Sequence, residues 1–166
     1  MIGLTLAAPA ALEGLVSTLL PLSDLVRDQL RRAGTFKLKA RGGSMWPFLR
    51  DGDVVWLREA ALGDLRIGDV ICYADSGDRL FVHRLVDRDG DTLVTRGDML
   101  TYVDRVPAHA FLGRAIAFER NGRHVRLETT WQRRLSRTIV WLAPVLVRPL
   151  SLAVTVRRLW RNVRHV

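Results

Sequence analysis

The residues of this chain with the clearest chemical potential are a serine, a histidine and two aspartates that follow one another in sequence. Ser44 lies in the run Gly-Gly-Ser-Met-Trp-Pro (42–47), where the glycines permit a sharp turn and the proline stiffens it. Such a turn presents one hydroxyl on a rigid loop. His83 comes later in the chain, and Asp98 and Asp104 follow it. These side chains are the components of a hydrolytic triad, in which a histidine activates a serine.

The expected roles follow from the acid–base properties of these groups. A hydroxyl is a weak nucleophile until a base removes its proton, and a histidine with an ordinary pKa of about 6.5 does so near neutral pH. We therefore predict Ser44 as the nucleophile and His83 as the base. Asp104, 21 residues after His83, and Asp98, 15 residues after it, both qualify as the acid that orients the imidazole. The remaining carboxylate would fix its own loop by accepting backbone N–H bonds.

Acyl transfer also requires hydrogen-bond donors for the oxyanion that develops during attack. The backbone N–H of Ser44 is the natural first donor, and we expect Gly42, Gly43 and Met45 to line the substrate side of the serine. Gly42 has no side chain with which to donate. A second donor must therefore come from another loop, from the backbone or from a water molecule.

Taken together, these residues resemble the signal peptidase superfamily, which also includes the LexA-like self-cleaving repressors. The resemblance runs from about residue 41 to residue 117, and its elements occur in the family's order: Ser44-Met45-x-Pro47, Gly52-Asp53, His83-Arg84, Gly97-Asp98 and Asp104. A histidine in place of a lysine is similar to the branch found in the endoplasmic reticulum, archaea and some bacteria. The resemblance implies a serine endopeptidase that cleaves leader or signal-like peptides after small residues. It also implies that Asp104 orients the histidine.

Three features depart from the family pattern and keep other functions open. Gly42 stands where the family often has a hydroxyl residue, and Met99-Leu100 follow Gly-Asp where asparagine is common. A clean N-terminal membrane anchor is also missing. Gly42 and Met99-Leu100 favour the alternative of a catalytically inactive peptide-binding module that docks on a membrane or a partner protein, and the missing anchor argues against ordinary secretory preprotein processing. A self-cleaving repressor would need a lysine base, but Lys37 and Lys39 are the only lysines and both precede Ser44.

The elements that must position these residues are mostly short strands. Alternating or continuous apolar runs predict strands at 36–40, 53–57, 70–73, 80–86, 92–95, 112–118 and 124–127. Asp89-Gly90 and Asn121-Gly122 are typical of tight hairpin turns, and residues 75–78 predict another turn. The predicted fold class is therefore mainly β: a signal-peptidase/LexA-like antiparallel domain, flanked by N-terminal and C-terminal helices.

The N-terminal part of the chain predicts helix. Apolar residues recur at spacings of three and four over 10–32, which is the pattern of an amphipathic helix. Ser23 and Asp24 are suitable caps for a second helix after Pro21. The apolar stretch 1–22 is interrupted by prolines and by Glu13, which argues against a membrane anchor. We divide the chain into an N-terminal helical segment (1–33), a β peptidase domain (34–129) and a basic apolar helical tail (130–166).

Charge is concentrated in that tail. The 166-residue chain has a net charge of +9, and eight arginines with no acid lie between residues 131 and 166. Pro144, Arg148 and Pro149 interrupt the apolar part of the tail, so an interfacial helix pair is favoured over a membrane span. Such a tail suits peripheral contact with an anionic membrane or an acidic partner. No nucleic-acid motif accompanies it, so a nucleic-acid partner is not expected.

The remaining composition limits the chemistry and the cellular compartment. Hydrophobic residues make up 48% of the chain, enough for a core. The single cysteine, Cys72, cannot form an internal disulfide, and its apolar surroundings in sequence predict a buried thiol. No Cys or His cluster has metal-ligand spacing, so neither a metal nor another cofactor is expected. We predict a cytoplasmic protein with a peptide or preprotein substrate and membrane contact through its tail.

Overall fold

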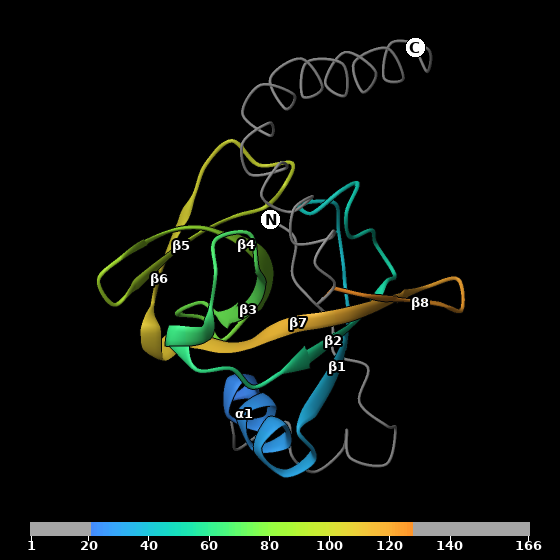
Figure 1. Ribbon diagram of the computed structural model, residues 1–166, viewed down its shortest axis with the longest axis horizontal. Coiled ribbons are helices and arrows are strands. Elements are labelled where there is room, and N and C mark those ends of the chain that lie inside the picture. The colour runs from blue at the N-terminus through green and yellow to red at the C-terminus, as the bar shows by residue number, and fades with distance from the viewer. Residues whose placement is uncertain (1–20, 128–166) are drawn as a thin grey trace, which may run out of the picture.

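The alternating apolar pattern of the central chain builds one strongly twisted antiparallel sheet (Figure 1). The computed structural model describes residues 21–127. Within that range lie one α-helix and eight strands: α1 (Leu22–Ala33), β1 (Thr35–Lys39), β2 (Val54–Arg58), β3 (Val70–Ala74), β4 (Leu80–Asp89), β5 (Thr92–Arg96), β6 (Asp104–Pro107), β7 (Phe111–Arg120) and β8 (Arg123–Arg126). Two 3-10 turns, η1 (Leu62–Asp64) and η2 (Ala108–Ala110), connect strands. The prediction of a mainly β, antiparallel fold is confirmed.

The strand order brings distant parts of the sequence together. It runs β1-β2-β7-β3-β4-β5-β6, with β8 paired to the outer part of β7, and every pairing is antiparallel. Strand β7 therefore joins the β1–β2 hairpin to the β3–β4–β5–β6 meander. Strand β4 pairs with β3 from Leu80 to Arg84. Its pairing with β5 begins only at Arg84, and the register of that pairing shifts after Leu85. The coiling of this meander lets the start of β6 lie over β3 and β4.

Helix α1 packs on one side of this sheet and contacts β1 and β7 (Figure 1). Its buried face carries Val26 and Leu30, and Gly34 ends it in the left-handed conformation with φ of 70°. The N-cap position is Pro21, which makes no side-chain capping hydrogen bond, and the predicted caps Ser23 and Asp24 lie inside the first turn. Instead, the carboxylate of Asp78, in the β3–β4 turn, accepts from the backbone N–H groups of Leu22 and Ser23. A long-range contact thus replaces the local cap that the sequence indicates.

The hydrophobic core forms two clusters that meet near β4. The larger one packs α1 against the β1–β2–β7 sheet and includes Met45 and Leu49 from the loop that carries Ser44. The smaller one lies under the meander and consists of Leu65, Ile71, Tyr73, Leu85, Leu93, Val106 and Phe111. Strand β4 contributes Val82 to the first cluster and Leu85 to the second. The two clusters therefore fix the two sides of the site relative to each other.

Several sequence predictions differ from the structure in detail or fall outside it. Strand β6 was not predicted, because its four residues contain no alternating apolar pattern. The segments 1–20 and 128–166, with the predicted start of the N-terminal helix and the helical tail, lie outside the described residues. Within the described residues, no helix is long and apolar enough to cross a membrane.

Candidate active site

Ser44 lies on a loop whose ends are joined by backbone hydrogen bonds. We call residues 40–53 the serine loop. Its ends close where Ala40 N–H donates to Asp53 O over 2.7 Å and Gly52 N–H donates to Ala40 O over 2.9 Å. Gly42 and Gly52 adopt φ of 89° and 88°, which other residues tolerate poorly. The glycines flanking this turn are therefore conformational requirements, as the sequence indicates.

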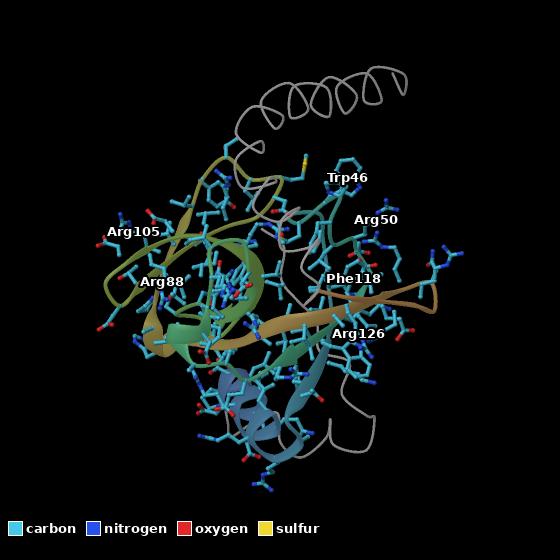
Figure 2. All side chains as sticks on the ribbon, viewed as in Figure 1. Trp46, Arg50, Arg88, Arg105, Phe118 and Arg126 are labelled. Carbon is cyan, nitrogen blue, oxygen red and sulfur yellow. The ribbon has the colours of Figure 1, made fainter. Side chains whose placement is uncertain are left out.

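Side chains from β7 hold the serine loop against the sheet. Arg120 forms a bidentate ion pair with the buried Asp53, with Nε to Oδ1 at 2.9 Å and Nη2 to Oδ2 at 2.6 Å. The same Nη2 donates to Phe48 O, and the Phe48 ring packs edge-on against Phe118. Trp46, on the same loop, instead points away from the sheet (Figure 2). The loop is thus anchored on one side and presents its other side to solvent.

His83 lies in the middle of β4, directly opposite Ile71 of β3. Its side chain is 5% exposed. The Nε2 atom is 3.3 Å from Ser44 Oγ, and Nδ1 is 3.0 Å from Asp104 Oδ2. Because a carboxylate only accepts hydrogen bonds, Nδ1 carries the proton and Nε2 is left to accept the serine hydroxyl. This is the tautomer that a general base for Ser44 requires.

The environment of His83 keeps the imidazole neutral. Burial lowers the pKa of His83 below its ordinary value of 6.5, and the nearby carboxylates of Asp104 and Asp98 oppose this effect without cancelling it. At neutral pH the ring is therefore in the form that can accept a proton. This is the state expected of a resting general base.

Asp104 reaches His83 from the edge of the sheet. It is the first residue of β6, and the alternation of that strand turns Asp104 inward while Arg105 points to solvent (Figure 2). The side chain of Asp104 is 36% exposed. Its Oδ2 accepts a second hydrogen bond from the hydroxyl of Tyr73 on β3, over 2.7 Å. Asp104 is therefore the carboxylate that the fold places on the imidazole.

Asp98 has a different partner, the buried Arg84. Two parallel hydrogen bonds join them, Nε to Oδ1 at 2.8 Å and Nη2 to Oδ2 at 2.7 Å. Arg84 is 1% exposed, donates to Gly68 O, and lies over the face of Phe48 with its guanidinium carbon 4.6 Å from the ring centroid. Asp98 thus fixes its loop through a guanidinium and not through the backbone N–H bonds expected from the sequence. Its oxygens are occupied by Arg84, and it makes no hydrogen bond to His83.

The loop after β5 supports the backbone of the serine directly. Met99 N–H donates to Ser44 O over 2.8 Å. Gly97 permits this approach, because a Cβ at that position would lie 2.7 Å from Ser44 O and 2.8 Å from Leu100 Cδ1. The Arg84–Asp98 pair therefore holds a loop that in turn holds the backbone of Ser44.

The residues predicted to line the substrate side of Ser44 divide into separate roles. The N–H of Gly42 donates to Asp51 Oδ1 over 2.7 Å, so it is not available to an oxyanion. The N–H groups of Gly43 and Ser44 meet no hydrogen-bond acceptor within residues 21–127, so both remain available as donors. Met45 is 4% exposed and packs into the core beside the serine.

Two hollows meet at Ser44 and His83. A cleft of about 950 Å³ extends from them across Phe81 to Arg27 of α1 and to β6. A small pocket of about 20 Å³ also reaches Ser44 and His83. It lies between the serine loop and β4 and is lined by Ala40, Arg41, Gly42, Ser44, Met45, Leu49, Arg50, Phe81, Val82 and His83. A space of this size accommodates little more than a methyl group. The site thus combines an open groove with a restrictive pocket.

Sequence reasoning missed Tyr73 and the structural role of Arg84. A signal for Tyr73 was available, because the predicted turn at 75–78 pairs Tyr73 with Phe81, and this register puts Tyr73 diagonally across from His83 on the same face. No local signal pairs Arg84 with Asp98. Lys37 is one of the two lysines that could serve as the base in a repressor-like mechanism. Its Nζ lies 3.9 Å from the Trp56 ring centroid.

No group of three or more His, Cys, Asp or Glu side chains is arranged to bind a metal in the described part of the chain. Comparison of the chain with known protein families, curated proteins and solved structures finds no match. The geometry of the site is therefore the observation from which a function can be inferred.

Proposed function

We propose that this chain is a serine endopeptidase of the signal-peptidase-like kind, acting on leader or signal-like peptides. The observation that supports it is the hydrogen-bonded series Ser44 Oγ–His83 Nε2–His83 Nδ1–Asp104 Oδ2, built from three separate elements at the junction of two hollows. Ser44 is the nucleophile, His83 the general base and Asp104 the acid that orients the imidazole.

The proposed reaction balances with these groups alone. Ser44 Oγ bonds to the peptide carbonyl carbon while its proton passes to His83 Nε2. The N–H groups of Gly43 and Ser44 donate to the oxyanion. The carbon–nitrogen bond then breaks, the departing amine takes the proton from Nε2, and an acyl-enzyme remains. Water attacks this ester, gives its proton to Nε2, and the serine leaves as the proton returns to it.

The free edge of β4 supports binding of an extended peptide. Between Leu80 and His83, β4 pairs with β3 on one side, and no strand within residues 21–127 occupies the other side. The serine loop lies across that open edge, with the small pocket between them. A peptide added there as a strand would run past Ser44 with its backbone hydrogen-bonded. Only a small side chain, such as alanine, would fit the pocket just before the cleaved bond.

The test is active-site labelling together with peptide cleavage. The purified chain is reacted with a fluorophosphonate, and the adduct is located by mass spectrometry beside Ser44→Ala and His83→Ala. A peptide with alanine before the cut and its leucine counterpart are then compared. Labelling at Ser44 that both variants abolish, with cleavage of the alanine peptide alone, is the expected result.

The second function to consider is peptide binding without turnover, since the open β4 edge would serve either. If the alanine peptide binds but neither labelling nor cleavage occurs between pH 6 and 9, the peptidase proposal is wrong and the binding module is favoured. We place the activity in the cytoplasm, at a membrane surface or a partner reached through the basic tail.

A further inference from the structure

Tyr73 lies at the end of the Ser44–His83–Asp104 series, where the sequence analysis expected no residue. It is 4% exposed, in the middle of the smaller hydrophobic cluster, and its ring stacks on Phe81 with centroids 5.6 Å apart. Its hydroxyl oxygen is 2.7 Å from Asp104 Oδ2 and 3.0 Å from His83 Nδ1. The hydroxyl therefore touches both partners of the hydrogen bond that sets the tautomer of His83.

The position of Asp104 explains why such a contact matters. Asp104 begins an edge strand, directly after the exposed residues Tyr102 and Val103, and its own side chain is 36% exposed. A carboxylate in that position has rotamers that point into water and away from the imidazole. The side chains of His83 and Tyr73 both donate to it. Tyr73 is fixed by burial, whereas Asp104 is not.

We propose that Tyr73 is a positioning residue, whose hydroxyl holds the Asp104 carboxylate where it accepts the Nδ1 proton of His83. The hydroxyl donates to the same Oδ2 that receives Nδ1–H, so one oxygen is held by two donors from β3 and β4. The aromatic ring supplies rigidity, because the Phe81 stack and the core leave it one orientation. The kinetic part of this inference rests on the proposed peptidase function, but the structural part does not.

The charged and titratable groups around the site support donation from the Tyr73 hydroxyl to the Asp104 carboxylate. Those that act on His83 are Asp104 from β6 and Asp98 from the loop between β5 and β6, the latter already bound to Arg84. Burial raises the pKa of the Tyr73 hydroxyl above its ordinary range, so the group remains a protonated donor throughout the working pH. The Cys72 thiol beside it is likewise protonated, because burial raises its pKa to about 12.

The first experiment measures the pKa of His83 by NMR in histidine-labelled protein, with the resonance assigned through His83→Gln. Tyr73→Phe removes only the hydroxyl and keeps the ring on Phe81. We expect the pKa of His83 to fall in this variant, because a released Asp104 offsets the effect of burial less well. Tyr102→Phe, which removes the other tyrosine hydroxyl of the chain, is the matched control and should leave the pKa of His83 unchanged.

A double-mutant cycle shows whether the effect passes through Asp104. Asp104→Ala should lower the pKa of His83 by itself, and Tyr73→Phe should then change it no further. If Ser44 labels with the fluorophosphonate, Tyr73→Phe should slow labelling roughly ten- to hundred-fold, the range of a lost hydrogen bond to a charged group. In the Asp104→Ala background the same substitution should not slow it.

Two outcomes would overturn the positioning role. An unchanged pKa of His83 in Tyr73→Phe would mean that Asp104 is held in place without the hydroxyl. A raised pKa of His83 would mean that the hydroxyl competes with Nδ1 for the carboxylate. If Tyr73→Phe does not fold, the ¹³Cζ shift of Tyr73 in folded Asp104→Ala decides instead, since an unchanged shift would disprove the contact. Neither measurement needs turnover, so absence of peptidase activity would refute the proposed function alone.

Discussion

Alanine substitutions of the two aspartates that follow His83 should affect different properties. Asp98→Ala should mainly lower the free energy of unfolding, and Asp104→Ala should mainly slow the labelling of Ser44. Asp98→Ala leaves the guanidinium of Arg84, 1% exposed, with the Gly68 carbonyl and the Phe48 face as its partners among residues 21–127. Removing one member of a buried ion pair costs about 3–5 kcal/mol, a large part of the roughly 5–15 kcal/mol that stabilises a domain. Asp104 is 36% exposed and its removal strands no buried charge, so it should cost less, about 1–3 kcal/mol for the buried donors of His83 and Tyr73 that lose their acceptor.

Urea unfolding at pH 7, followed by tryptophan fluorescence, measures this difference directly. Asp104→Ala should instead slow fluorophosphonate labelling of Ser44 by roughly 10²- to 10⁴-fold, because the base loses its orientation. The matched control is the double variant Arg84→Met/Asp98→Leu, which removes both charges and should be more stable than Asp98→Ala. A free energy of unfolding for Asp98→Ala equal to or above that of Asp104→Ala would refute the assignment of Asp98 to the scaffold.

Two further predictions concern the serine backbone and the base. Gly97→Ala places a Cβ against Ser44 O, so it should displace Ser44 and reduce the rate of labelling roughly 100-fold. Gly63→Ala, which has open space around its Cβ, is the control and should label at the normal rate. Equal labelling rates in the two variants would contradict this packing. The rate of labelling should increase with pH in a titration whose midpoint lies below pH 6.5. Protonated His83 cannot accept a proton, and burial lowers the pKa of its imidazole. Asp104→Ala should move this midpoint lower still; a midpoint above 6.5 in the unmodified protein would contradict the sign.

Local sequence patterns accounted for most of the strands and for the serine turn. Hairpin signals such as Asn121-Gly122 and the alternation along β3 and β4 depend on neighbouring residues, so they could be identified without the fold. Strand β6 could not, because its four residues acquire their conformation by pairing with β5. The cap of α1 was wrong for a related reason, since Asp78 approaches from a turn more than 50 residues away in the chain.

The chemical components of the site were determined by the sequence alone. The types and order of Ser44, His83 and Asp104, and the glycines around the serine, define which groups are able to act as nucleophile, base and acid. That inference needs only the acid–base properties of side chains and the conformational freedom of glycine. It predicts what chemistry is available, but it leaves open which of two aspartates takes part.

Only the tertiary structure decided between those aspartates and added Tyr73 to the site. Asp98 and Asp104 are six residues apart, and the loop between them has no regular pattern from which to infer direction. The choice depends on how far the sheet coils, which brings the start of β6 over β3 and β4, and on the burial of Arg84, which requires a carboxylate of its own. Both are consequences of packing between residues far apart in the chain, where desolvation and close contact outweigh local preference.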